Sequence, residues 1–254
     1  MTTTTLTDHT HSAELALGSA AETLRRMLHT VLPAVDPYQV AAHYLPADIV
    51  NKVGGDWYDA VPGIRGRLTA VIGDVAGHDM AAAARMGHLR SMFRANAVDR
   101  DESPSALLRR LDTANHRLGD PSIATAIVAV LDARDGRHRL RWSNAGHPPP
   151  VLIERDGQVR MLGGHDLLIG VRQYARRHTW TCTLPAGATI LLYTDGLVER
   201  RGHSLDDGLA RLRGRLAGNG RGSLAEVLTA AAGPETEQTD DIAMLAIRVP
   251  AAGR

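Results

Sequence analysis

The chain has 254 residues, which suits one large domain or two small ones. Lys and Arg together number 29 and Asp and Glu 28, so the overall charge favours neither a nucleic-acid groove nor a polyanionic partner. Cys182 is the only cysteine, which excludes a disulfide framework and favours a reducing compartment. No apolar run approaches the length of a membrane span and no signal-peptide pattern is present, so we expect a cytoplasmic protein without a membrane partner.

The first part of the chain is predicted to hold a tail and one helix. Residues 1–11 are Thr-rich and are expected to be a disordered tail. Over residues 12–32, apolar side chains recur at alternating spacings of four and three, which predicts an amphipathic helix that ends at Pro33. This heptad stripe is shorter than a sustained coiled coil. Two interpretations stay open, namely docking on the chain's own domain and a homodimer interface.

The remaining predicted elements form one domain over residues 38–250, with strands first, then a helix pair, many strands, a second helix pair and a last strand. The run 123–131 is almost wholly apolar, so both faces of this strand should be buried. This order favours an α+β fold with helices segregated outside the sheets. Strands are expected over 38–44, 53–61, 68–72, 123–131, 139–143, 151–153, 159–162, 179–184, 189–193 and 242–249. Helices are expected from about Asp79, from Ser103-Pro104, over 205–216 and from the capping box Ser223 to Glu226.

Four aspartates share one context in this pattern. Asp56, Asp74 and Asp195 adjoin glycines at strand ends, and Asp240 stands just before the last strand. Four unrelated turn aspartates would produce the same pattern, because Gly and Asp are ordinary turn residues. If the four instead converge, their carboxylates need cations between them. An oxygen-only ligand set then favours Mg²⁺ or Mn²⁺ over Zn²⁺.

Five short motifs follow one another along the chain. They are Gly54-Gly55-Asp56-Trp57-Tyr58-Asp59, Gly73-Asp74-Val75-Ala76-Gly77-His78, Asn144-Ala145-Gly146-His147-Pro148, Thr194-Asp195-Gly196 and Thr239-Asp240-Asp241. In this order they resemble the metal-dependent protein phosphatases of the protein phosphatase 2C type (PPM), and within them the bacterial SpoIIE/RsbU-like branch. The resemblance extends from about Val40 to Val249 and depends on the order of the motifs, because each motif alone is weak.

The resemblance implies a four-layer α-β-β-α sandwich, in which two antiparallel sheets lie face to face between layers of helices. It also implies two Mn²⁺ or Mg²⁺ ions at one end of the sandwich. The expected nucleophile is a water activated by these ions, so no protein side chain is expected to act as the nucleophile.

The implied metal ligands come from two parts of the chain. Asp56 and Asp74 are expected to be shared by the two ions, and Asp195 and Asp240 to bind one ion from the other side. Val75 is expected to contribute its backbone carbonyl. Further residues are expected to support the site without binding metal. They are Gly55, Asp59, His78, Asp79, Asn144, His147, Gly196 and Asp241.

Asp79 and the groups that would protonate or bind the phosphate are considered separately. Asp79 stands where the family often has glycine, and we expect it to cap the helix that begins there. No general acid for the leaving oxygen is identifiable from the sequence. Arg65 and Arg67 are the arginines considered as phosphate contacts.

The sequence therefore predicts a metal-dependent protein serine/threonine phosphatase. The resemblance implies a phosphorylated anti-anti-sigma-type regulator as the substrate and a possible homodimer through residues 12–32. The alternative is a catalytically weak or silent module that binds a phosphoprotein through the same surface.

Overall fold

The computed structural model describes the chain in five stretches and covers most of the predicted domain. The predicted tail, the predicted N-terminal helix up to residue 31, His78 and Thr239 lie outside the described residues. The described residues are 32–46, 54–77, 79–134, 136–234 and 240–251.

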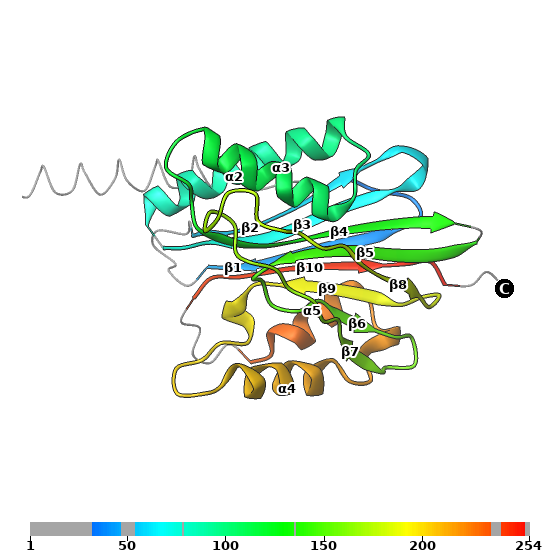
Figure 1. The fold of residues 1–254 in the computed structure, drawn as a ribbon. Helices are drawn as coiled ribbons and strands as arrows, with labels where there is room; N and C mark the ends of the chain where they lie inside the picture. The colour runs from blue at the N-terminus through cyan, green and yellow to red at the C-terminus, as the bar shows by residue number, and fades with distance from the viewer. Residues whose placement is uncertain (1–31, 47–53, 78, 135, 235–239, 252–254) are drawn as a thin grey trace, which may run out of the picture.

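Two five-stranded sheets lie face to face in the centre of the molecule (Figure 1). Neighbouring strands are antiparallel in both sheets. The first sheet has the order β1 (Gln39–Leu45), β10 (Ile242–Arg248), β9 (Thr189–Tyr193), β6 (Val151–Ile153) and β7 (Val159–Met161). The second has the order β2 (Asp56–Pro62), β3 (Leu68–Val75), β4 (Ala124–Arg134), β5 (Arg137–Ala145) and β8 (Trp180–Leu184).

Helices cover the outer face of each sheet, which confirms the predicted four-layer α-β-β-α sandwich (Figure 1). Helices α2 (Met80–Asp99) and α3 (Pro104–Arg117) pack on the second sheet. Helices α4 (Leu205–Leu216) and α5 (Leu224–Ala232) pack on the first. Short 3₁₀ turns lie at η1 (Ile64–Gly66), η2 (Asp195–Leu197) and η3 (Asn219–Arg221). No helix among the described residues is long and apolar enough to cross a membrane.

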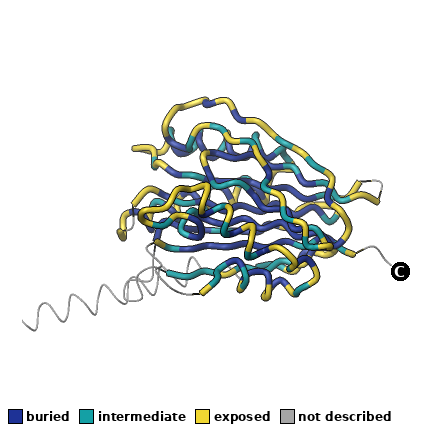
Figure 2. Tube along the Cα trace, turned by 90° about the horizontal axis from the view of Figure 1, so that it is seen from below, coloured by how far each residue is buried: buried dark blue, intermediate teal, exposed yellow. Residues whose placement is uncertain are grey.

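Three apolar layers follow from this arrangement. Strand β4 is apolar on both faces, as predicted, because each of its faces borders one of these layers. Ile127 and Leu131 pack between the two sheets, whereas Val128 and Val130 face α2 and α3. The alternation of side chains along a strand supplies both layers from one continuous apolar run. In Figure 2 the buried positions accordingly run along the strands, and most exposed positions lie in turns and outer faces.

The helix ends follow the predicted capping pattern. The Asp79 side chain accepts a hydrogen bond from the Ala82 amide at 2.7 Å, so Asp79 is the N-cap of α2 as expected. Ser103 caps α3 directly before Pro104, and Ser223 begins α5 with a capping box. These side chains satisfy amide groups that have no partner inside the helix.

One prediction about the strands needs correction. The apolar run 68–72 was expected to end before Asp74, but β3 extends to Val75. Backbone pairing on both sides explains the extension, because Asp74 pairs with Asp56 on β2 and with Thr125 on β4. Asp74 is therefore part of a central strand and not of a turn.

A buried ion pair fastens the long connection between β7 and β8 to α3. The Arg177 Nη2 atom lies 2.6 Å from Asp112 Oδ2, and the two side chains are 0% and 2% exposed. Arg177 also donates to the backbone carbonyls of Leu167 and Leu168, and Asp112 accepts from the Gly170 amide. Each charge is thus compensated in a site that excludes water.

We expect Arg177→Met to lower the free energy of unfolding by about 3–5 kcal/mol, because it leaves the Asp112 carboxylate buried without its cation. Arg139→Met is the matched control. Its partner Asp132 lies 3.2 Å away in a partly exposed pair and keeps Arg141, so the expected loss is about 0–1 kcal/mol. Urea unfolding of both variants measures the difference. Equal losses would contradict the assignment of Asp112–Arg177 as a buried structural pair.

Candidate metal centre

The second sheet brings two of the predicted aspartates directly opposite each other. Asp56 is the first residue of β2 and pairs across the ladder with Asp74 near the end of β3. Directly opposite residues in an antiparallel pair have their side chains on the same face of the sheet. Strand pairing alone therefore places these two carboxylates side by side.

The first sheet supplies the other acids at the same end of the sandwich. Asp195 begins η2 and is separated from the end of β9 by Thr194 alone. Asp240 lies two residues before β10, which pairs with β9. Thr194 joins these two strand ends, because its amide donates to the Ala243 carbonyl at 3.0 Å and its Oγ1 accepts from the Ala243 amide at 2.8 Å.

One buried hydrogen bond crosses from the first sheet to the second at this end. Thr194 Oγ1 donates to Asp56 Oδ2 at 2.7 Å, across a sequence separation of 138 residues. Thr194 is 0% exposed and Asp56 5% exposed. The bond fixes the orientation of the Asp56 carboxylate and holds the ends of β9 and β2 together.

The acids act on one another electrostatically, which shows that they converge. Burial raises the pKa of Asp56 well above its usual range, and the neighbouring Asp74 charge raises it further, while the Thr194 hydrogen bond opposes the shift. Burial, followed by the charges of Asp195 and Asp240, raises the pKa of Asp74 to about 7. Burial also raises the pKa of Asp195. Unfavourable ionisation of this kind is relieved by a cation between the carboxylates.

Two glycines leave room around these acids. A Cβ atom at Gly55 would collide with the Val75 carbonyl oxygen and approach Asp74 Oδ1 to 2.8 Å. A Cβ atom at Gly196 would collide with the Asp241 carbonyl oxygen. The Val75 carbonyl and the Asp74 carboxylate thus border the same small space beside Gly55, and any larger residue would fill it.

The donors present fit a hard divalent cation. Among the residues that the structure describes, no three Asp, Glu, His or Cys side chains form a closed ligand group. The carboxylates come from two sheets and act on one another electrostatically at one end of the sandwich. Their oxygen-only chemistry suits Mg²⁺ or Mn²⁺, which bind carboxylates, carbonyls and water.

Asp59, expected near the site, has a different role in the structure. Its carboxylate is fully buried and accepts two hydrogen bonds from Arg94 Nη1, at 2.7 and 2.8 Å. Arg90 Nε lies 3.5 Å away. Both arginines belong to α2, so Asp59 ties this helix to the strand that begins with Asp56.

Asn144 and His147 close a tight loop after β5. The Asn144 side chain accepts from the His147 amide at 2.7 Å and donates to the His147 carbonyl at 2.8 Å. His147 Nδ1 lies 2.8 Å from Thr125 Oγ1, and the buried Nε2 has no hydrogen-bond partner among the described residues. Burial lowers the pKa of His147 to about 3. His147 is therefore a neutral, packed residue near the site and a poor source of catalytic protons.

The buried neutral state of His147 predicts a pH dependence of stability. The unfolded histidine binds a proton below about pH 6.5, whereas the folded one does so only near pH 3. The unfolded state thus binds more protons between these values, and stability should rise with pH over this range. We expect His147→Gln to reduce the slope of unfolding free energy between pH 5 and 6.5, measured by urea unfolding. Equal slopes for the wild-type protein and His147→Gln would contradict the buried neutral state of His147.

The arginines beside the acids differ from those considered from the sequence. Arg65 and Arg67 lie in the β2–β3 turn, at the end of the hairpin opposite Asp56 and Asp74, and Arg67 pairs with Asp101. The two arginines considered from the sequence therefore do not adjoin the acids. A pocket of about 390 Å³ instead adjoins the acids, and a basic cluster after η2 lines it. The lining residues are Gly196, Glu199, Arg200, Arg201, His203, Leu205 and Asp240.

Arg200 and Arg201 lie close to Asp195 in the sequence. This closeness could have identified them as residues beside the acids. They follow the Thr194-Asp195-Gly196 motif by a few residues. In the structure, Arg200 and Arg201 follow η2 and line the same pocket as Asp240 at the acidic end.

The four-layer sandwich with converging acids defines a PP2C-like phosphatase fold. The family described as Stage II sporulation protein E (SpoIIE) matches residues 64–250, and the chain belongs to this family of PP2C-like phosphatases.

Solved structures show the same fold. The RsbU and RsbW domains of Rv1364c from Mycobacterium tuberculosis superpose with a TM-score of 0.76 at 29% identity, over 88% of this chain and 63% of that one. The SiaA-PP2C domain of Pseudomonas aeruginosa superposes with a TM-score of 0.74 at 23% identity, over 94% of this chain and 98% of that one.

Two curated relatives match at lower coverage of their own length. Phosphoserine phosphatase RsbP of Bacillus subtilis (strain 168) is 25% identical over 65% of this chain and 40% of that protein. Protein IcfG of Synechocystis sp. (strain ATCC 27184 / PCC 6803 / Kazusa) is 25% identical over 90% of this chain and 38% of that protein. The chain thus spans about two fifths of the length of these relatives.

Proposed function

We propose that the chain is a metal-dependent protein serine/threonine phosphatase that hydrolyses phosphoserine and phosphothreonine. The observation that carries this proposal is the convergence of Asp56, Asp74, Asp195 and Asp240 at one end of the sandwich, with the pKa values of the first three raised. Membership of the SpoIIE family and the likeness to phosphoserine phosphatase RsbP support it.

Two Mn²⁺ or Mg²⁺ ions are the proposed cofactors, held by the four aspartates and the Val75 carbonyl. When bound, such a pair activates water as a nucleophile and offsets the charge on the phosphoryl oxygens. RsbX, which shares this fold with a TM-score of 0.65 at 15% identity, was solved in complex with magnesium. In this chain, Thr194 orients Asp56, and Gly55 and Gly196 keep backbone oxygens accessible.

The basic cluster beside the acids is proposed to receive the phosphorylated side chain. Arg200, Arg201 and His203 line the pocket that also includes Asp240. Guanidinium groups bind phosphate oxygens with paired, charge-assisted hydrogen bonds. A phosphoprotein could thus be held by cations on one side of the pocket while its phosphorus faces the acids on the other.

The proposed substrate is a phosphorylated regulator of the anti-anti-sigma type in the cytoplasm. RsbP is a phosphoserine phosphatase, and one similar structure contains an RsbU domain joined to an RsbW domain. These relatives support a regulatory phosphoprotein as the substrate class.

The second candidate function is a catalytically weak or silent module that binds a phosphoprotein. Asp79, in place of the usual glycine, is the observation that favours it. Its carboxylate caps α2 close to the acidic end and lies 3.8 Å from Arg85. Tight binding of a phosphoprotein without turnover in saturating Mn²⁺ would favour this function over hydrolysis.

We expect Asp74→Asn to lower phosphatase activity by at least about 100-fold, above the range seen when only a supporting residue of a metal site is lost. The change keeps the shape of the side chain and removes one charge that would neutralise the ions. Asp195→Asn and Asp240→Asn should raise the Mn²⁺ concentration needed for activity, so that excess Mn²⁺ partly restores the rate. Activity against p-nitrophenyl phosphate and a phosphoserine peptide, measured over a Mn²⁺ series, gives these values.

Asp99→Asn is the matched control, because Asp99 is an exposed residue at the far end of α2 and should tolerate the change. Circular dichroism confirms that each variant is folded. A folded Asp74→Asn protein with wild-type activity and metal dependence would refute both the site and the mechanism. Wild-type protein without any turnover in Mn²⁺ would refute the enzymatic function.

We also propose that residues 12–32 support a homodimer, because the apolar stripe there exceeds the needs of a free tail. Leu24→Glu, within the stripe, is expected to convert a dimer to a monomer in light scattering. Arg26→Glu, outside the stripe, should leave the mass unchanged. A monomeric wild-type protein, or a dimeric Leu24→Glu variant, would contradict the proposal.

A further inference from the structure

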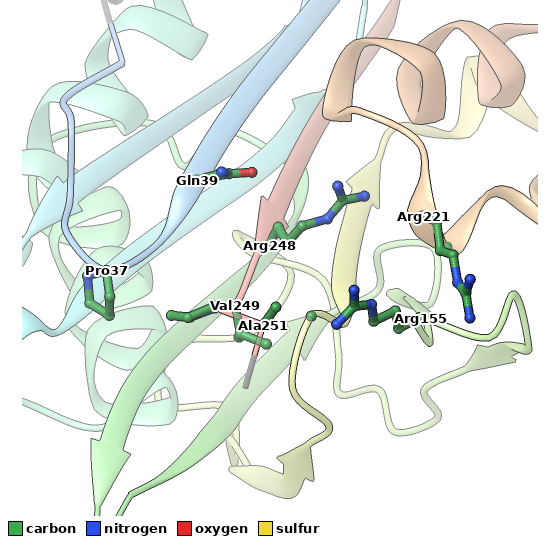
Figure 3. Close-up of a pocket in the computed structure, with 10 residues that line it drawn as sticks. Pro37, Gln39, Arg155, Arg221, Arg248, Val249 and Ala251 are labelled. Atoms are coloured by element: carbon green, nitrogen blue, oxygen red, sulfur yellow. The ribbon is translucent and has the colours of Figure 1, made fainter. Parts of the chain in front are cut away.

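A second basic pocket lies at the end of the sandwich opposite the acids. Strand β10 joins the two ends, because it starts beside Asp241 and finishes at Arg248. There Arg248 pairs with Gln39 on β1 and with Thr189 on β9. Figure 3 shows the residues that line the pocket. Its volume is about 390 Å³. Its lining residues are Pro37, Gln39, Arg155, Gly187, Gly220, Arg221, Arg248, Val249, Pro250 and Ala251.

The fold brings three arginines to this pocket from three separate segments (Figure 3). Arg248 ends β10, Arg155 lies in the β6–β7 turn, and Arg221 ends η3. A Cβ atom at Gly187 would come within 3.1 Å of Arg155 Cδ, so the Arg155 stem packs on the Gly187 backbone. A Cβ atom at Gly220 would collide with the Glu154 carbonyl, so η3 lies directly against the β6–β7 turn. Arg155 and Arg221 are thus held next to each other by close backbone packing.

The positive charge of these arginines is not balanced by carboxylates among the described residues. None of the three forms an ion pair there. The acids adjacent in the sequence have other partners. Glu154 pairs with Arg160 at 3.2 Å, and Asp156 accepts hydrogen bonds from Gln158.

Arg248 is the most constrained of the three. Its Nε donates to Thr189 Oγ1 at 2.8 Å and its Nη1 to the Gly222 carbonyl at 2.6 Å. Its Nη2 is buried and has no hydrogen-bond partner within the described part of the chain. The guanidinium group is thus fixed in the wall of the pocket, where its positive charge attracts an anion.

We propose that this pocket binds a small phosphorylated anion, at a site separate from the acidic end. Arg155 and Arg221 are exposed, and each can donate two parallel hydrogen bonds to phosphate oxygens, while the anchored Arg248 adds positive charge. The volume lies in the range of sites for small ligands. Among the described residues, the lining contains no aromatic ring on which a base could stack, so charge and not base identity selects the ligand. A compact di- or polyphosphate group fits these features.

Inorganic pyrophosphate is the probe, and isothermal titration of the whole chain in EDTA measures its binding. Without metal, the clustered carboxylates at the acidic end repel this anion. Because Arg200 and Arg201 also carry positive charge there, the loss of binding in a variant of the arginine pocket, and not binding alone, assigns the site. We expect the double variant Arg155→Gln/Arg221→Gln to bind pyrophosphate at least about tenfold more weakly, since it removes two charge-assisted contacts. Both side chains are exposed, and the anchored Arg248 stays in place.

Arg109→Gln is the matched control, because it removes one exposed arginine from α3 and should leave binding unchanged. Asp74→Asn should also bind pyrophosphate normally, so the test does not depend on catalysis. Binding weaker than about 1 mM by the wild-type chain, or equal binding by the double variant, would overturn the proposal. Binding of a phosphoserine peptide that is tighter than that of pyrophosphate and that the double variant loses would overturn the assignment to a small anion and indicate a protein ligand.

Discussion

Mutual repulsion among the carboxylates at one end of the sandwich is the constraint on which the site depends. Asp56 and Asp74 come from one sheet and Asp195 and Asp240 from the other, so the acids meet only because the sheets are held face to face. The Thr194–Asp56 hydrogen bond joins the two sheets at this point and favours the ionised form of Asp56. Apolar packing elsewhere in the fold must outweigh the repulsion that remains.

The apolar layers provide that packing. Side chains such as Ile72 and Leu245 fill the space between the sheets, and the helices bury the outer faces. Asp59 adds a specific link, because its buried pair with Arg94 fixes α2 relative to β2. The strand that begins with Asp56 is thus held on its inner face by packing and on its outer face by an ion pair.

Charge is segregated along the sandwich in a way that the total charge conceals. The chain has a formal net charge of +1, yet β10 has acids before its first residue and a cationic pocket at its last. A net charge near zero argues against a large nucleic-acid surface, but it carries no information on local clusters of charged residues. Only the folding of the turns at Arg155 and Arg221 against the end of β10 creates the second cluster.

The sequence by itself determined the fold class, most strands and helices, and the helix caps. Local periods and capping rules act over a few residues, so the apolar strand β4 and the caps Asp79 and Ser103 could be recognised directly. The ordered motifs also identified the family and named the four acids. Only the tertiary structure decided that Asp59 serves an ion pair, that Asp74 lies inside a strand, and that Arg200 and Arg201, not Arg65 and Arg67, adjoin the acids. These outcomes depend on strand register and on which turns share an end of the sandwich, and such contacts join residues far apart in the sequence.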